Sequence, residues 1–243
     1  AGTTQVAATA AQIAPALRSD RAGTQRFLVG LLSSTPGETI HGVGLWYAPY
    51  AFKAGQRQFA PYAHRTPQGR IVVTYDWSRV KQRYVQNAQT AVTQPYFDKD
   101  HVYISAVHDM RVGGKSIGVT TADTTSGGVD VFLKQISNPQ NLAYLITPAG
   151  HVAAFPQPND LVQFAATRHP VNTILDVTDA DAAAFIAQRY PGDRTPVRTP
   201  AANMPLILVN SFATSALGGA SPPLILLVIA AVLIWALTIA AIL

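Results

Sequence analysis

Cysteine is absent from this 243-residue chain, and its absence excludes several kinds of site at once. Without thiols there is no disulfide framework, no thiolate zinc site and no cysteine nucleophile. Charged residues are sparse, at 13% of the chain, and the basic residues behind the net charge of +5 recur mostly singly. Scattered cations do not form the continuous patch that binds phosphates, so we expect no nucleic-acid partner.

Catalytic and metal-binding motifs are missing as well. The chain has no Gly-x-Ser-x-Gly nucleophile motif, and no dinucleotide-binding fingerprint follows a predicted strand. Its six histidines lack the spacing that puts two metal ligands on one helix face. We therefore expect a protein that is not an enzyme and that holds no cofactor and no metal.

Charge is missing altogether from the last part of the chain. No Asp, Glu, Lys, Arg or His follows Arg198, and residues 224–243 are almost wholly apolar. At about 1.5 Å per residue, a helix over 224–243 is roughly 30 Å long, the thickness of a bilayer's hydrocarbon core. We predict one C-terminal transmembrane helix over 222–243, in which no ionisable residue supports proton relay or ion conduction.

Two features of the predicted span indicate contact with another membrane helix. Ala236 and Ala240 form a small-xxx-small face, and Trp235 lies near mid-depth, away from the interfaces where Trp is enriched. The alternative is that alanine is simply common here and that Trp235 faces lipid. The sequence leaves both interpretations open.

The residues before the span predict a mixed α+β domain with an antiparallel sheet. Apolar residues at helical spacing over 6–32, interrupted at Pro15 and Gly23, predict a long or broken N-terminal helix. Gly113-Gly114 predicts a hairpin turn. The other expected elements are strands within 42–52, 57–64, 70–77, 101–110, 115–124, 141–155 and 204–210, helices over 78–91, 127–136 and part of 160–188, and a Pro-rich connector over 191–205. The acidic segment Thr178-Asp179-Ala180-Asp181 predicts a helix N-terminus, where negative charge is favoured.

Several segments, in order along the chain, resemble the Cache family of extracytoplasmic sensor domains. The most specific are Pro95-Tyr96-Phe97-Asp98 and the strand Ile117-Gly118-Val119, which ends in Asp123. The resemblance covers about residues 12–155 and implies a PAS-like fold of degenerate double-Cache type, with a long N-terminal helix and a periplasmic location. The implied domains are an N-terminal helix with a distal module (1–139), a reduced membrane-proximal lobe (140–212), a linker (213–221) and the transmembrane helix (222–243).

The resemblance also implies a pocket for a small ligand. A carboxylate facing an amine, with aromatic rings around an apolar body, would suit such a site. Val92 and Gln94 depart from the family, whose ligand-binding members commonly carry Trp and an acidic residue there. These departures favour the alternative that the pocket residues serve turns and packing. The candidates are Tyr75, Asp76, Trp77, Tyr96, Asp98 and Asp123.

Two functional hypotheses follow. The principal one is a membrane-anchored periplasmic accessory subunit that binds and stabilises a larger membrane-protein complex, for which a photosynthetic reaction-centre and antenna assembly is one candidate. The departures at Val92 and Gln94 favour it, as does the lack of a kinase, cyclase or signalling coiled coil after the span. The alternative is the small-molecule-sensing ectodomain of a bacterial chemoreceptor or sensor kinase. Both place the chain in the inner membrane, with membrane proteins as partners of its helix and its periplasmic domain.

Overall fold

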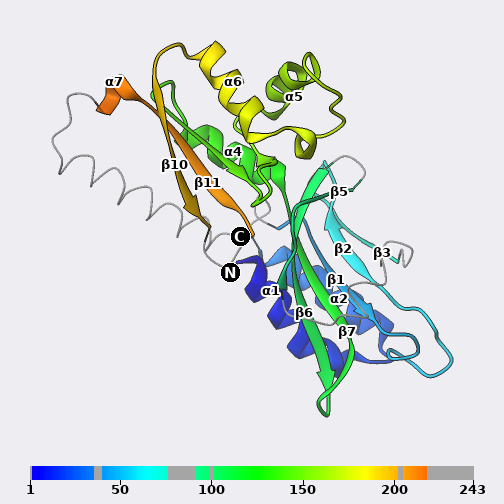
Figure 1. Ribbon diagram of the computed structural model, residues 1–243. Helices are drawn as coiled ribbons and strands as arrows, with labels where there is room; N and C mark the ends of the chain where they lie inside the picture. The colour runs from blue at the N-terminus through cyan, green and yellow to red at the C-terminus, as the bar shows by residue number, and fades with distance from the viewer. Residues whose placement is uncertain (1, 36–39, 76–90, 99–100, 202–204, 218–243) are drawn as a thin grey trace. The chain divides into compact units, whose positions relative to one another are not determined.

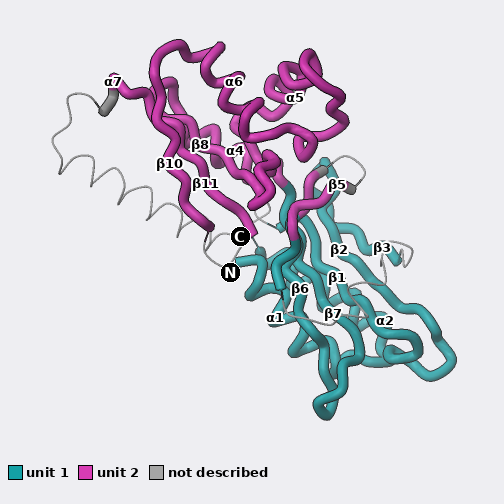
Figure 2. The backbone as a smooth tube through the Cα atoms, viewed as in Figure 1, with its two compact units in different colours: residues 1–93, 104–125, 242–243 teal, residues 94–103, 126–241 magenta. Residues whose placement is uncertain are grey.

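The computed structural model describes residues 2–35, 40–75, 91–98, 101–201 and 205–217, which fall into two compact units (Figures 1 and 2). Among the described residues, those up to 93 and from 104 to 125 form unit 1, and the others form unit 2. Each unit combines helices with antiparallel strands, which confirms the predicted α+β class.

The predicted span lies outside the described residues, and so do Trp235, Ala236 and Ala240. Most of the helix predicted over 78–91 lies outside them too. Among the residues that are described, no helix is both long enough and apolar enough to cross a bilayer.

Three helical segments open unit 1: α1 (Thr3–Ile13), the 3-10 helix η1 (Ala14–Leu17) and α2 (Arg21–Ser33). Helix α1 ends two residues before Pro15, which has no N–H for a continuing α-helix, and Ser19 turns the chain with a φ of 68°. Asp20 then caps α2 by accepting a hydrogen bond from the Gly23 N–H at 2.8 Å. The predicted broken helix is confirmed, although Gly23 lies in the first turn of α2 and does not interrupt it.

The sheet of unit 1 has the strand order β3-β2-β1-β7-β6-β4. Its strands are β1 (Gly42–Tyr47), β2 (Tyr62–Arg65), β3 (Ile71–Thr74), β4 (Ala91–Val92), β6 (His101–Val112) and β7 (Lys115–Thr125). Residues 101–103 of β6 belong to unit 2, where they pair with β5 (Tyr96–Asp98). The predicted turn at Gly113-Gly114 joins β6 to β7 with φ values of 55° and 80°, which favour glycine.

Helices α1 and α2 pack on one face of this sheet. Alternation along β1 directs Val43, Leu45 and Tyr47 into the core that they share with these helices. The Tyr47 hydroxyl donates a 2.9 Å hydrogen bond to the Ala14 carbonyl. Because the helices occupy this face, the neighbouring residues of β1 lie on the opposite one.

Unit 2 contains a four-stranded sheet in the order β10-β11-β8-β9. Its elements are α4 (Ser126–Ile136), β8 (Asn141–Ile146), β9 (Val152–Ala154), α5 (Pro158–Ala166), the 3-10 helix η3 (Ile174–Asp176), α6 (Asp179–Arg189), β10 (Arg194–Pro200), β11 (Ile207–Ala213) and α7 (Thr214–Leu217). The prediction of a Pro-rich connector over 191–205 is wrong for residues 194–200, which form strand β10. Pro196 and Pro200 fit a strand because β10 lies at the sheet edge, where a missing N–H costs no ladder bond.

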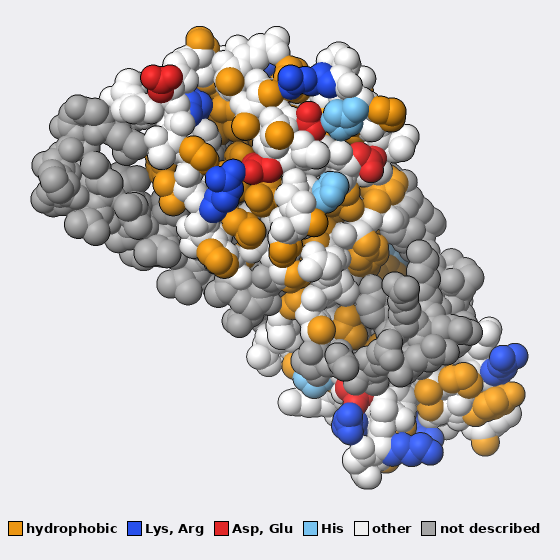
Figure 3. Space-filling model, viewed as in Figure 1, with side chains coloured by type: hydrophobic (Ala, Val, Ile, Leu, Met, Phe, Trp, Pro, Cys, Tyr) orange, Lys and Arg blue, Asp and Glu red, His pale blue; other side chains and the backbone are white. Residues whose placement is uncertain are grey.

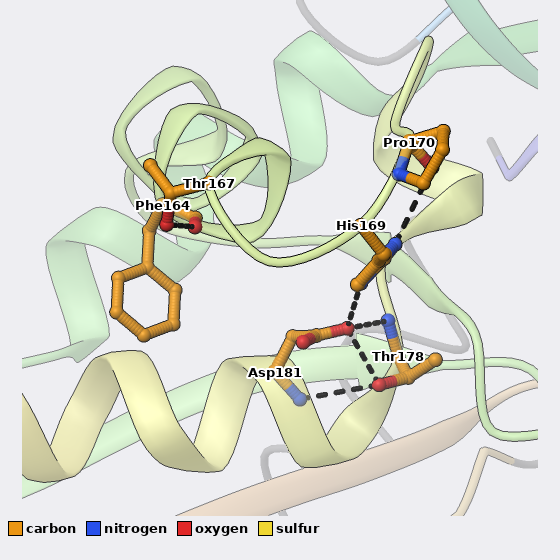
Figure 4. A network of polar contacts seen from close by, with 6 residues as sticks. All are labelled: Phe164, Thr167, His169, Pro170, Thr178 and Asp181. Atoms are coloured by element: carbon orange, nitrogen blue, oxygen red, sulfur yellow. Dashed lines mark hydrogen bonds and ion pairs between the residues drawn. The ribbon is translucent and has the colours of Figure 1, made fainter.

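A capping box starts α6, as the acidic segment after Thr178 predicts (Figure 4). The Thr178 hydroxyl accepts from the Asp181 N–H at 3.2 Å, and the Asp181 carboxylate accepts from the Thr178 N–H at 3.0 Å. The Nε2 atom of His169, in the loop after α5, lies 2.9 Å from Oδ2 of the same Asp181 carboxylate. Burial by itself raises the pKa of Asp181, but the bonds from Thr178 and His169 outweigh it and leave that pKa below its ordinary value.

A second carboxylate ties α4 to the end of β9. Asp130 Oδ1 accepts a 2.9 Å hydrogen bond from the N–H of Phe155, a buried core residue. Burial raises the pKa of Asp130 to about 7, although the Phe155 bond opposes the shift. The carboxyl group is therefore held in surroundings that penalise its charge.

We expect the contribution of His169 to stability to depend on pH. The hydrogen bond to Asp181 raises the pKa of His169 above 6.5, so the contribution is full below pH 6.5 and is lost as the pH rises through the folded-state value. Chemical denaturation should show a larger loss for His169→Gln at about pH 5 than at about pH 9. An equal loss at both pH values would contradict this coupling.

Asp130→Asn should raise stability increasingly as the pH rises from about 4 to about 8. The pKa of Asp130 rises from 3.8 to about 7, so its favourable contribution is present below pH 3.8 and is lost as the pH rises through about 7. Asn keeps an oxygen for the Phe155 N–H. We expect a gain in unfolding free energy of roughly 1–3 kcal/mol at about pH 8 and little gain at about pH 4. Asp160→Asn, at a half-exposed carboxylate of α5, is the control.

Candidate functional site

The face of unit 1's sheet opposite α1 and α2 has a floor of glycine on β1. Gly42 and Gly44 alternate with the core residues of this strand and are followed on the same face by Trp46. A Cβ on Gly42 would lie 2.2 Å from the Tyr62 hydroxyl, and one on Gly44 would lie 2.7 Å from Trp46 Nε1. Both positions therefore require glycine for the aromatic side chains to lie flat on the strand.

Four aromatic rings form a continuous layer on this floor. Trp46 stacks near Tyr62, with ring centres 6.0 Å apart, and Tyr62 stacks near His64 at 5.5 Å. His64 in turn lies 5.8 Å from His41. The indole N–H of Trp46 donates to the Thr121 hydroxyl at 3.0 Å, which joins the layer to β7. Stacking and this bond fix the orientation of the rings.

Asp123 stands at the edge of the aromatic layer. Its partner across the β1–β7 ladder is Gly42, and the partner of Gly42 on β2 is His64. Asp123, Gly42 and His64 therefore form one row across three strands, and the Tyr62 hydroxyl lies over Gly42 in the middle of that row. Asp123 is only 6% exposed, so its carboxylate is shielded from bulk water.

This arrangement suits a small ligand with a cationic group and an apolar body. A buried carboxylate attracts an ammonium group more strongly than an exposed one does, because water screens it less. Aromatic faces contact apolar atoms and also attract cations. The imidazole of His64 and the hydroxyl of Tyr62 add polar groups that can orient such a ligand.

The predicted pocket residues are distributed over several places. Tyr75 packs on the helix side of the sheet, with its ring centre 5.7 Å from that of Phe59 and the Arg21 guanidinium 4.3 Å away. It therefore lies on the face opposite Asp123, and the structure does not bring these two together.

The other predicted residues lie outside unit 1's described sheet face. Tyr96 and Asp98 belong to β5 in unit 2, where the ring of Tyr96 lies 5.9 Å from that of Tyr103. Asp76 and Trp77 lie outside the described residues.

Sequence reasoning missed the aromatic layer. The signal was present in Gly42-Val43-Gly44-Leu45-Trp46, where glycine alternates with core residues and leaves one face of the strand bare. Tyr62, His64 and His41 carry no comparable local signal, because only the strand register brings them beside Trp46.

Unit 2 holds another polar cluster, which braces its sheet. The buried Tyr144 hydroxyl donates to Asp179 Oδ1 at 2.7 Å, and Arg198 pairs with Asp179 Oδ2 at 2.6 Å. Burial, together with the Asp179 carboxylate, raises the pKa of Tyr144 and keeps the phenol protonated. Within the described part of the chain, no group of three or more His, Asp or Glu side chains could hold a metal ion.

Comparison with known proteins identifies this architecture at the level of structure. No protein-family model matches the sequence, and no curated protein matches it. The extracellular domain of mmHK1S-Z3, assigned as a histidine kinase, is similar at 17% identity over 89% of this chain and 87% of that one, with a TM-score of 0.61. Methyl-accepting chemotaxis protein X is also similar, at 15% identity over 85% of this chain and 89% of that one, with a TM-score of 0.58.

A third similar structure contains a ligand. It is the ligand-binding domain of the Pseudomonas fluorescens chemoreceptor CtaA in complex with L-serine. The identity is 17% over 87% of this chain and 88% of that one, with a TM-score of 0.52. The comparisons give no support for the accessory-subunit hypothesis. The chain has the fold of the extracellular sensor domains of histidine kinases and chemoreceptors, in agreement with the Cache-like resemblance of its sequence.

Proposed function

We propose that this chain is the small-molecule-sensing ectodomain of a membrane receptor and that its ligand binds on the Asp123 face of unit 1. The observation that supports this most is the convergence of buried Asp123 with the stacked layer of Trp46, Tyr62 and His64. An amino acid or a related amine is the ligand class that this chemistry suits. The L-serine bound by the CtaA domain, whose fold is similar, is an example of that class.

Each group of the proposed site has a distinct role. Asp123 accepts hydrogen bonds from the ligand's ammonium group, and the Trp46 ring supports the ligand's apolar part. Tyr62 and His64 orient its remaining polar atoms. Asp76 and Trp77 remain predicted contributors, and Tyr96 and Asp98 of unit 2 stay predictions from the sequence, whereas Tyr75 serves the helix-side core.

Strand β7 offers a route from the proposed site to α1. Three residues before Asp123, on the helix side of the same strand, the Thr120 hydroxyl donates a 2.7 Å hydrogen bond to the Ala7 carbonyl of α1. A ligand that favours one position of β7 would thereby favour one packing of α1. Sensing then consists of a shift between two packings, driven by the ligand's different affinity for each.

A thermal-shift screen of the full chain with L-amino acids and simple amines tests the binding proposal. We expect at least one compound to raise the melting temperature by several degrees, since a ligand at a hundredfold excess over its Kd adds about 2.7 kcal/mol. Asp123→Asn should abolish the shift. Asp109→Asn, at another buried carboxylate of the same sheet, should keep it. The accessory-subunit hypothesis predicts no shift with any compound.

Gly44→Ala tests the aromatic floor. The added methyl group would displace the Trp46 ring and break its hydrogen bond to Thr121, so we expect roughly tenfold weaker ligand binding by calorimetry and a shift in tryptophan emission. Gly30→Ala is the matched control, since a Cβ there meets no atom within 4 Å and should add roughly 0.5–1 kcal/mol of helix stability. Unchanged affinity in Gly44→Ala would remove Trp46 from the site.

A further inference from the structure

The loop between β1 and β2, residues 48–58, is held in one conformation. The Tyr50 N–H donates to the Arg57 carbonyl at 3.1 Å, and the Gln56 N–H donates to the Lys53 carbonyl at 3.1 Å, so the loop closes on itself. Phe52 anchors it from beneath, with its ring stacked 3.7 Å from that of Phe59 in the core. The surface of this loop is therefore already ordered.

The segment between η1 and α2 fixes the same loop from outside. The Ser19 N–H donates to the Phe52 carbonyl at 3.1 Å, and Arg18 Nε donates to the Ala51 carbonyl at 2.6 Å. Preorganisation of this kind lowers the entropy that binding a partner would cost.

Tyr50 is presented to solvent at the cost of backbone strain. It has a φ of 64° and is 56% exposed. Ser19 is the one other non-glycine residue with a positive φ in the part of the chain that the structure describes, and it contacts this same loop. A bulky side chain in the left-handed region is disfavoured, and such strain is concentrated at functional surfaces.

Positive charge surrounds this tyrosine. Lys53 and Arg57 are exposed on the loop, Arg18 is exposed beside it, and residues 48–58 contain no acidic residue. The residues of unit 1 carry twelve Lys and Arg against five Asp and Glu, whereas those of unit 2 carry six against eight. Figure 3 shows Lys and Arg side chains beside hydrophobic ones at the end of unit 1 that includes this loop.

We propose that the loop of residues 48–58, together with Arg18, docks a protein partner whose surface carries carboxylates around an apolar depression for the Tyr50 ring. Tyr and Arg are the residue types that most often dominate binding energy at protein interfaces. Positive charge around the ring speeds encounter with an acidic surface and fixes the orientation of docking. One ring on a rigid loop offers little apolar area to a bilayer, into which amphipathic segments insert many side chains.

Site-specific photo-crosslinking in the full chain tests the docking surface. A photoreactive residue replaces exposed Ala54, so that Tyr50 and the cations stay intact, and the chain is irradiated in membranes of its own host. We expect one discrete protein adduct, whose crosslinked peptide lies in an Asp- and Glu-rich surface. Tyr50→Gly should reduce the adduct at least tenfold while relieving backbone strain, so unfolding would not explain the loss. The double variant Lys53→Glu, Arg57→Glu should abolish it.

Two controls separate docking from folding and from ligand sensing. Arg70→Glu reverses another exposed cation elsewhere in unit 1 and should leave the adduct unchanged. Asp123→Asn should leave it unchanged too, because the loop's partner does not depend on the proposed ligand site. The proposal fails if no adduct forms, if the adduct is a lipid or a nucleic acid, if its peptide is not acidic, or if the charge reversals do not weaken it.

Discussion

Unit 1 depends on one constraint, which is that the two faces of strand β1 carry different kinds of residues. Val43, Leu45 and Tyr47 face α1 and α2, while Gly42, Gly44 and Trp46 face the other way. Because β1 lies between β2 and β7, a shift of one residue in its register would put the glycines in the core and the large apolar residues on the opposite face. The same hydrophobic alternation that builds the core therefore also creates the floor of the candidate site.

The carboxylates of unit 2 and Asp123 of unit 1 have different surroundings. In unit 2, Asp130, Asp179 and Asp181 accept hydrogen bonds from backbone or side-chain donors and hold helices to neighbouring segments. The pKa shifts of Asp130 and Asp181 follow from burial and from these bonds, so a perturbed pKa at these two residues reports packing. Asp123 differs because it lies at the edge of an aromatic layer, on the sheet face opposite α1 and α2. The surroundings of a carboxylate, more than its burial, separate the proposed binding group Asp123 from the carboxylates that hold unit 2 together.

The functional hypotheses change accordingly. The departures at Val92 and Gln94 concern residues in and after a short strand, and Val92 pairs with Ala106 in the helix-side core. They do not affect the row formed by Asp123, Gly42 and His64, so they weaken the sensor hypothesis less than the sequence alone suggested. Similarity to sensor domains shows the fold, and the chemistry of the Asp123 face supports a ligand of the amine class. The basic loop around Tyr50 adds a second surface with a different kind of partner.

Short-range signals in the sequence determined much of the local structure. Pro15 predicted the break in the N-terminal helix, and Gly113-Gly114 predicted the hairpin turn. Thr178 and Asp181 predicted the start of α6. Each of these residues acts within a few positions of the chain, through backbone geometry or capping. Only the tertiary structure decided that β10 is an edge strand, that Tyr75 and Asp123 lie on opposite faces, and that Trp46, Tyr62 and His64 stack. These features depend on which strands pair and in what register, and strand pairing is set by burial across the whole unit.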